Sequence, residues 1–328
     1  MTLFGGWLKR SDKPGSPGWH GTAALRAPQQ FSDTSYPFDP RWAARLGGLV
    51  FRPQGPAEGP IVGHHESRRR GRAGEFIDRR SYSPGDDLRR IDWKVYGRSD
   101  RWTVREERED TNLRVSLLLD VSASMAFSAD GRSQKRHYAA GLLAGLGYVL
   151  HRGGDAMGWG FFEHTLLSFQ PPRCGADVLA RLFDQLRRPP QGTIARFLKS
   201  FQAFLAQPLG RGAMVVVSDF LGDLNDILSG FRWLRSRGRD ISALQVLDPV
   251  ELDLSFRGAR RFNDLESSDA LRADPEGLRH SYQKLMGARQ SALSRGLSAL
   301  SVDHVLFRTD RPVDEGLAAF FRHRSLRR

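Results

Sequence analysis

The sequence predicts an α/β fold with a doubly wound, mostly parallel sheet, preceded by a smaller N-terminal segment of short strands and loops. Short, nearly continuous apolar runs, which are typical of buried parallel strands, alternate with longer segments in which apolar residues recur at helical spacing. Turn residues separate the two kinds of segment, as at Gly153-Gly154-Asp155. Strands that alternate with helices in this way favour a parallel sheet with helices on both faces.

The apolar runs and the helical spacing also give the expected order of elements. We expect strands at 115–119, 156–162, 166–169, 213–217, 241–247 and 303–307. We expect helices at 41–49, 134–150, 178–186, 194–205, 223–237, 276–300 and 313–321. Residues 1–40 are rich in Gly, Pro, Ser and charged residues, which predicts a flexible N-terminal arm. Residues 41–112 then form an Arg- and Asp-rich segment, and residues 113–328 form the α/β domain.

The charge of the chain restricts the partners that we expect. The net charge is +13, with 50 Lys and Arg against 37 Asp and Glu. A basic balance often indicates nucleic acid, an anionic membrane or an acidic protein as the partner. Acidic residues are interleaved with the arginines throughout this chain, so we do not expect nucleic acid to be the partner.

The cellular compartment is inferred from the cysteine and from the apolar stretches. The single cysteine, Cys174, has no second cysteine to pair with, which is compatible with a reducing cytosol. The longest apolar stretch, Ala139–Leu150, has 12 residues and is too short to span a bilayer. The N-terminus lacks the apolar core of a secretory signal. We therefore expect a cytoplasmic protein without a membrane span.

Polar side chains follow two of the expected strands. Strand 115–119 is followed by Asp120-Val121-Ser122-Ala123-Ser124, strand 213–217 by Ser218-Asp219-Phe220, and Thr193 lies in a loop between them. In sheets of this class, ligands bind at the carboxyl ends of the strands. The residues that we expect to converge there, and to form a metal site, are Asp120, Ser122, Ser124, Thr193 and Asp219.

The chemistry of these side chains indicates the kind of ion. All five supply hard oxygen donors, which suit one Mg²⁺ ion, or Mn²⁺ or Ca²⁺ in its place. Three neutral hydroxyls and two carboxylates leave a divalent ion incompletely neutralised, so the ion can attract a carboxylate from a partner. The alternative is helix capping, because Asp, Ser and Thr are common caps. Capping by Thr193 of the helix at 194–205 stays open, and Asp223 is expected to begin its own helix.

The same spacing resembles a known binding site. Asp-x-Ser-x-Ser after an apolar strand, a Thr in a loop and an Asp after a second strand resemble the metal-ion-dependent adhesion site of von Willebrand A domains. This resemblance implies that Ser122 and Ser124 bind the ion directly and that Thr193 binds it directly or through water. It also implies that Asp120 and Asp219 lie mostly behind bound waters.

Several further motifs occur in a fixed order along the chain. They are Gly74-Glu75-Phe76, Arg80–Asp87, Arg89–Lys94, Gly97-Arg98-Ser99, Val104-Arg105-Glu106, Val246–Glu251, Phe262–Glu266, Leu278-Arg279 with Tyr282, and Arg308-Thr309-Asp310. Together they resemble the bacterial domain-of-unknown-function 58 (DUF58) family over residues 41–328. The resemblance implies a von Willebrand A-like domain and a MoxR-type AAA+ ATPase as partner, without an established enzymatic activity. Many members begin with two membrane-spanning helices, and this chain resembles the soluble subset.

The block Arg79–Lys94 has its own interpretation. Pro84-Gly85-Asp86-Asp87 predicts a turn, and its carboxylates can form ion pairs with the neighbouring Arg79, Arg80, Arg89 and Arg90. Such a network can clamp the N-terminal segment to the α/β domain. A partner-binding surface is the second hypothesis, and catalysis by Asp86, Asp87 or Asp92 is the third.

The favoured function is a non-enzymatic, metal-dependent, adaptor- or chaperone-like binding component that works with a MoxR-type ATPase and an acidic client protein. The sequence contains no phosphate-binding G-x-x-x-x-G-K-[ST] motif and no G-x-S-x-G nucleophile motif. Two alternatives stay open. One is a metal-dependent phosphoesterase or nuclease, which would use the carboxylates with Mg²⁺. The other is a basic module that binds nucleic acid, for which salt-dependent retention on RNA is the test.

Overall fold

A computed structural model describes residues 37–53, 78–81, 93–106, 113–129, 133–187, 192–209, 212–263 and 270–326 of the chain. These residues belong to two compact units. One lies within Met1–Gly55 and Arg114–Arg328, and the other lies within Pro56–Leu113.

The described residues of the smaller unit form one antiparallel strand pair and one short helix. Strand β1 (Asp78–Ser81) pairs with β2 (Thr103–Glu106), and α2 (Trp93–Ser99) lies between them in the sequence. The rings of Trp93, Tyr96 and Trp102 contact one another, with centroids 4.7 to 6.2 Å apart. The short strands agree with the prediction for this segment. The predicted Pro84–Asp87 turn and its arginine partners at 89 and 90 lie outside the described residues.

The larger unit is built on a six-stranded sheet in the order β10-β7-β6-β3-β4-β5. All neighbouring strands are parallel except β5, which runs antiparallel to β4 at one edge. The strands are β3 (Arg114–Asp120), β4 (Ala156–Phe162), β5 (Leu166–Arg173), β6 (Ala213–Ser218), β7 (Asp240–Leu247) and β10 (Asp303–Arg308). The predicted doubly wound, mostly parallel sheet is therefore confirmed.

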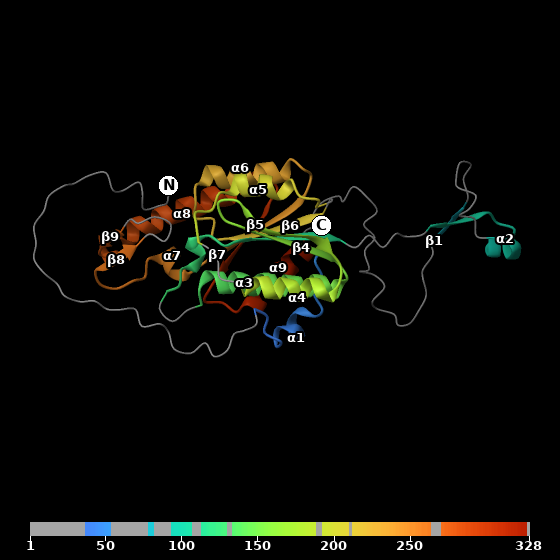
Figure 1. The fold of residues 1–328 in the computed structure, drawn as a ribbon, viewed down its shortest axis with the longest axis horizontal. Coiled ribbons are helices and arrows are strands. Elements are labelled where there is room, and N and C mark those ends of the chain that lie inside the picture. Colours follow the sequence, from blue (N-terminus) through green and yellow to red (C-terminus); the bar gives the residue numbers. More distant parts are fainter. Residues whose placement is uncertain are drawn as a thin grey trace, which may run out of the picture. The chain divides into compact units, whose positions relative to one another are not determined.

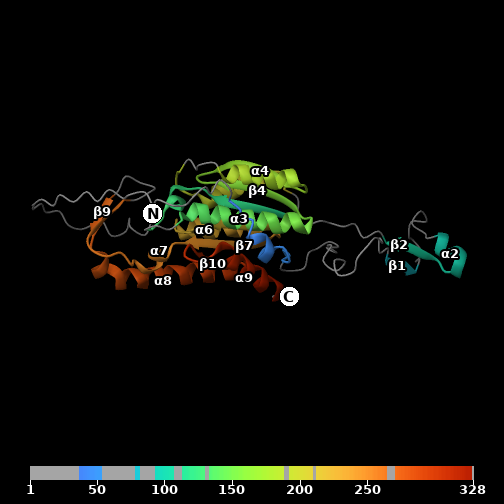
Figure 2. The same cartoon turned by 90° about the horizontal axis from the view of Figure 1, so that it is seen from below.

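Helices cover both faces of this sheet, with α5 and α6 above it and α3 and α4 below it in Figure 1. The first face carries α5 (Phe197–Leu205), α6 (Leu224–Arg235) and α8 (Pro275–Ala299). The second face carries α1 (Trp42–Leu46), α3 (Lys135–Gly153), α4 (Ala176–Leu186) and α9 (Val313–Leu326). Figure 2 shows α3 flanked by α4 and α9. None of the helices in the described ranges is long and apolar enough to cross a membrane.

A cluster of phenylalanine rings fills the core beneath α5 and α6. Phe162 of β4 meets Phe197 and Phe201 of α5 edge to face, and Phe220 after β6 packs against Phe231 of α6. All five rings are buried, and burial of each such side chain contributes roughly 1.5–3 kcal/mol to folding. This core fixes the ends of β4 and β6 next to the first turn of α5.

The residues before the smaller unit pack on the larger one. Phe38 stacks on Tyr148 of α3 with ring centroids 4.8 Å apart, and Leu46 and Phe51 are buried. Residues 37–53 therefore lie on the α/β unit, although residues 37–40 fall within the predicted arm and residues 41–53 within the predicted Arg- and Asp-rich segment. Residues 1–36 of that arm lie outside the described residues.

Several elements were not predicted. The helix α2 lies in a segment for which only strands and loops were expected. In the larger unit, the short helix α7 (Pro249–Asp253) and the antiparallel strands β8 (Arg260–Asn263) and β9 (Ala270–Ala273) were also not predicted. The helix α7 begins at a capping box, in which the Asp248 side chain accepts from the amide of Val250 while Glu251 accepts from the amide of Asp248. It thereby places Glu251 just beyond the carboxyl end of β7.

The order of the strands determines where a ligand can bind. The chain leaves β3 through α3 to reach β4 on one side, whereas β6 lies on the other side of β3. The direction of winding therefore changes between β3 and β6. In open α/β sheets, the crevice beyond the carboxyl ends of the strands at such a switch point is the common ligand site.

Candidate metal centre

Asp120, at the end of β3, is held by two hydrogen bonds. Its Oδ1 accepts from the backbone amide of Ser122 at 2.9 Å, and its Oδ2 accepts from the hydroxyl of Ser218 at 2.6 Å. Both Asp120 and Ser218 are buried. The carboxylate therefore faces the carboxyl end of β6, across the switch point.

The two serines of the loop after β3 lie side by side. The hydroxyl oxygens of Ser122 and Ser124 are 3.2 Å apart. A 3-10 helix (Ala123–Ala126) follows Ser122, whose side chain makes no capping bond to it. The helix α3 begins only at Lys135, so neither Asp120 nor Ser124 caps it. The capping alternative does not explain this loop.

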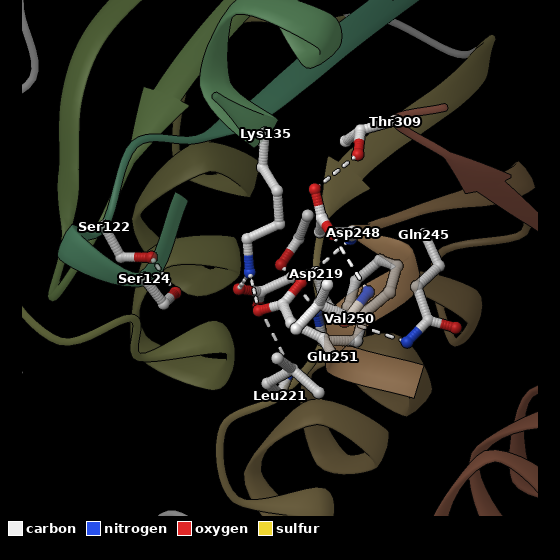
Figure 3. A network of polar contacts seen from close by, with 12 residues as sticks. Ser122, Ser124, Lys135, Asp219, Leu221, Gln245, Asp248, Val250, Glu251 and Thr309 are labelled. Carbon is white, nitrogen blue, oxygen red and sulfur yellow. Dashed lines mark hydrogen bonds and ion pairs between the residues drawn. The ribbon is translucent and has the colours of Figure 1, made fainter. Parts of the chain in front are cut away.

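Asp219 follows β6 and meets a lysine (Figure 3). Its Oδ2 accepts from Nζ of Lys135 at 2.7 Å, and its Oδ1 accepts from the amide of Leu221 at 3.1 Å. The next residue, Phe220, has a positive φ of 50°, a conformation that non-glycine residues seldom adopt. The amide of Phe220 donates to the Ser218 hydroxyl at 3.0 Å, and Asp219 has a hydrogen bond from Ser124 of the loop after β3.

Thr193 lies beside the serine loop, at the surface. Its carbonyl oxygen accepts from the amide of Ala123 at 3.0 Å, and its hydroxyl lies 3.1 Å from Nδ1 of His164. Its own amide donates to Glu163 at 2.9 Å. Capping of α5 by Thr193 is ruled out, because α5 begins at Phe197, whose amide donates to Asp226 at 2.7 Å.

The structure therefore brings the predicted residues to one edge of the sheet. Asp120, Ser122 and Asp219 are buried and Ser124 is half-buried, and a hydrogen bond from Ser124 contributes to the charge state of Asp219. Thr193 joins them through the backbone contact of its loop. The expectation that Asp223 begins its own helix is confirmed, because its carboxylate accepts from the amide of Asp226 at the start of α6.

Two residues of the site were missed by the sequence analysis. Lys135 is fully buried, and its Nζ lies 2.6 Å from Oε1 of Glu251 as well as 2.7 Å from Asp219. Lys135 opens a long apolar helix, and Glu251 ends one of the family motifs, Val246–Glu251. Those positions were visible in the sequence, but their meeting depends on how α3 and α7 pack.

The ionisation of the carboxylates follows from these contacts. Burial, and then the charge of Asp219, raise the pKa of Asp120 to about 7. Burial also opposes ionisation of Asp219, but the charge and hydrogen bond of Lys135 outweigh it and hold the pKa of Asp219 below its ordinary value. Burial raises the pKa of Glu251 above its ordinary value, although Lys135 opposes this. Asp120 is therefore the carboxyl group that most needs a further positive charge.

The charges and distances fit one divalent ion. When ionised, the carboxylates of Asp120, Asp219 and Glu251 outnumber the single ammonium of Lys135 by two negative charges. Adjacent oxygens around octahedral Mg²⁺ lie about 3 Å apart, given bonds of about 2.1 Å, and the serine hydroxyls have that separation. Within the described ranges, no group of three or more His, Cys, Asp or Glu side chains is arranged to hold an ion by itself. An ion here would therefore depend on the serine hydroxyls.

Comparisons with known proteins agree with the motifs. Uncharacterised proteins of Mycobacterium bovis and Mycobacterium tuberculosis are each 28% identical to this chain over 283 residues, which cover 83% of this chain and 86% of the relative. An uncharacterised protein of Mycobacterium avium is 25% identical over 163 residues, covering 47% of this chain and 92% of that protein.

Solved structures with a similar arrangement were also found. The conserved hypothetical protein BatB from Bacteroides thetaiotaomicron has a TM-score of 0.42 and 14% identity, and the match covers 65% of this chain and 99% of BatB. An aerotolerance-related membrane protein from Bacteroides fragilis has a TM-score of 0.42 and 16% identity, covering 65% of this chain and 98% of that one.

The predicted cytoplasmic location is corrected by this comparison. The Bacteroides fragilis protein is named as a membrane protein, and so is a membrane-spanning protein of Vibrio fischeri, matched at a TM-score of 0.22 and 12% identity over 64% of this chain and 98% of that one. The cytoplasmic assignment is therefore withdrawn.

The family itself is established by sequence. The profile described as "Protein of unknown function DUF58" matches residues 78–292, which is more than half of the chain and contains every residue of the candidate metal centre. The chain belongs to the DUF58 family.

Proposed function

We propose that this protein is a non-enzymatic binding component that docks an acidic side chain of a partner at a divalent metal ion. The observation that carries this proposal is a cluster of three carboxylates, those of Asp120, Asp219 and Glu251, with one ammonium group, that of Lys135, next to a pair of hydroxyls. When all three carboxylates are ionised, two negative charges are left over. A divalent ion would neutralise that excess and would be held by hard oxygens alone.

The residues that would hold the ion are Asp120, Ser122, Ser124, Thr193 and Asp219, an arrangement that resembles the adhesion site of von Willebrand A domains. Bound there, the ion supplies an exposed positive charge with an open coordination position. The residues of the site differ in their exposure to solvent, and this difference supports docking. Asp120 and Asp219 are only 1% and 2% exposed, whereas Thr193 is exposed, so a partner's carboxylate can approach from the Thr193 side.

The hydrogen bonds of the carboxylates favour binding over catalysis. Asp120 is bonded to Ser218, Asp219 to Lys135, and Glu251 to both Lys135 and the amide of Asp248. Each carboxylate is therefore engaged by donors of the protein. A phosphoesterase or nuclease would need one of them to activate water.

The likeness to the DUF58 family supports a MoxR-type AAA+ ATPase as the partner, with an acidic client protein as a second one. In this system the protein would act as an adaptor that grips one component through the metal centre. The strongly basic charge of +13 would also favour acidic partners at long range.

Calorimetric titration with Mg²⁺ and Mn²⁺ tests the metal centre. We expect wild type to bind one ion and Asp120→Ala to bind it at least about tenfold more weakly, because the variant removes one of the buried charges. Asp184→Ala, an exposed carboxylate on α4, is the matched control and keeps wild-type affinity. Equal affinity in wild type and Asp120→Ala would remove Asp120 from the site.

Docking is tested by capture of a MoxR-type ATPase on immobilised protein. We expect the complex to form with Mg²⁺ and to be lost with EDTA or in Asp120→Ala, since both remove the ion. The Asp184→Ala variant keeps the complex. A complex that survives EDTA unchanged would show association that does not pass through the ion.

A further inference from the structure

Lys135 places a permanent positive charge inside the candidate metal centre. Its Nζ lies 2.7 Å from Asp219 and 2.6 Å from Glu251, and it also faces the ring of Phe127, whose centroid is 5.7 Å away. The side chain is completely buried. Figure 3 shows it reaching from α3 toward both carboxylates, with Ser122 and Ser124 beside them.

Neither the helix nor the core explains a lysine at this position. Lys135 is the first residue of α3, where the helix dipole favours acidic side chains and opposes a positive charge. Removal of an ammonium group from water costs several kcal/mol unless carboxylates compensate it. The carboxylates of Asp219 and Glu251 supply that compensation, so the role of the Lys135 charge is to pair with these two residues.

The contact with Asp219 has a direct consequence for an ion. Oδ2 of Asp219 is bonded to Lys135, while Asp219 is also one of the proposed ion-binding residues. Two cations that share one carboxylate repel each other, and the repulsion is strong in a buried environment. The only other basic group in contact with this loop, among the described residues, is Arg289, which donates to the carbonyl oxygens of Phe220 and Gly222 instead.

We propose that Lys135 is a resident cation that competes with the metal ion for Asp219. It pairs with Asp219 and Glu251 when no ion is bound, and it weakens the affinity of the centre so that the ion is exchangeable. This inference rests on the proposed metal site and adds the residue that sets its affinity.

The first experiment compares the affinity for Mg²⁺ and Mn²⁺ in wild type and Lys135→Met by calorimetry on the full chain. Met has a similar length without the charge. We expect the variant to bind Mn²⁺ at least about tenfold more tightly, because the ion no longer shares Asp219 with an ammonium group. Lys199→Met, an exposed lysine on α5, is the matched control and keeps wild-type affinity. Unchanged or weaker binding by Lys135→Met overturns the proposal.

The second experiment measures thermal unfolding with EDTA and with Mg²⁺. Without an ion, Lys135→Met leaves the buried Asp219 and the half-buried Glu251 without this cation, so its Tm should fall well below that of wild type. With saturating Mg²⁺ the variant should regain most of the loss, since an ion that binds the folded state stabilises it, and more so the tighter it binds. A variant that is destabilised equally in EDTA and in Mg²⁺ counts against the competition.

A double variant covers the case in which Lys135→Met does not fold without an ion. Lys135→Met/Glu251→Gln removes one charge of each sign and keeps the excess of two negative charges. We expect it to fold and to bind Mn²⁺ more tightly than wild type. Glu251→Gln alone leaves Lys135 to Asp219 and should bind the ion more weakly than wild type. If Glu251→Gln binds Mn²⁺ more tightly than the double variant does, the proposal is overturned.

The same titrations separate this inference from the proposed function. Binding by wild type that Lys135→Met does not strengthen leaves the metal site standing and removes the competition. Binding by Lys135→Met but not by wild type supports the competition and contradicts a metal-dependent function of the natural protein. If none of the folded proteins binds an ion, both are wrong.

Discussion

The ammonium group of Lys135 lies 2.7 Å from Oδ2 of Asp219, so one of the two aspartates at the switch point already has a cationic partner. The other, Asp120, is bonded instead to a hydroxyl and an amide. The pKa values of the two side chains therefore differ: that of Asp120 is raised above its ordinary value, and that of Asp219 is lowered below it.

In the metal-free protein, Asp120 should make stability depend on pH. Its pKa is raised from 3.8 to about 7 in the folded state, so the folded protein holds this proton more tightly than the unfolded chain does. The resulting stability is fully present below about pH 4 and is lost as pH rises through about 7. Asp120→Asn carries no such proton and should lack this part of the decrease.

Urea unfolding in EDTA at several pH values between 5 and 8 measures the effect. The comparison is between the two slopes, because other groups titrate equally in wild type and variant. Asp184→Asn, exposed on α4, is the control and should follow wild type. Parallel curves for wild type and Asp120→Asn would mean that Asp120 is ionised throughout this range.

Ser218→Ala should destabilise the protein through two lost partners. The hydroxyl of Ser218 donates to Asp120 at 2.6 Å and accepts from the amide of Phe220 at 3.0 Å. Both partners are buried, so each is left without this bond, at a cost of about 1–3 kcal/mol in the free energy of unfolding. Urea unfolding measures the loss. Ser236→Ala, whose hydroxyl bonds to a carbonyl at the exposed end of α6, should stay within about 0.5 kcal/mol of wild type.

Glu163→Gln should loosen the loop that carries Thr193. The buried carboxylate of Glu163 accepts from the amide of Thr193 at 2.9 Å and lies 3.1 Å from Nδ1 of His164. Charge-assisted bonds are stronger than neutral ones, so the variant should weaken the attachment by about 1 kcal/mol. Amide hydrogen exchange at residues 192–196 should become several-fold faster. Glu276→Gln, exposed at the start of α8, is the control, and equal protection in all three proteins would contradict this role.

The fold was predictable from the sequence where a strand is covered on both faces of the sheet. Strand β3 is buried at all but its first residue, and a strand covered on both faces is a continuous apolar run in the sequence. The edge strand β5 was predicted only to 169 but extends to Arg173. The prediction stopped short because an edge strand is half exposed and its Gln170-Pro171-Pro172 lacks an apolar pattern. The helix α5 starts at Phe197 rather than 194, since its cap comes from Asp226 of α6.

The site was predictable where it follows strand ends. The positions of Asp120 and Asp219 follow from the rule that parallel strands align their carboxyl ends. Lys135 and Glu251 lie 116 residues apart in sequence, and their contact depends on a helix and a short capped turn that periodicity does not locate. A buried lysine at the first position of an apolar helix was the available signal.

Substitution of Arg324 tests whether the stability of the fold can be changed without changing the affinity of the metal centre. This buried side chain of α9 donates to the carbonyl oxygen of Arg52 at 3.0 Å, pairs with Asp240, and lies over the ring of Phe51 at 4.5 Å. Lys has neither the fork of donors nor the planar stacking surface of Arg. Arg324→Lys should therefore lower the free energy of unfolding by about 3 kcal/mol, as for other broken buried pairs.

Its effect on metal affinity should be absent, because Asp240 begins β7 and the candidate centre lies beyond the opposite ends of the strands. Urea unfolding and Mn²⁺ titration of the same samples measure both quantities. Arg322→Lys, exposed on α9, should match wild type in each. A loss of Mn²⁺ affinity in folded Arg324→Lys would show that the two ends of the sheet are coupled, since the substitution touches none of the ion-binding residues.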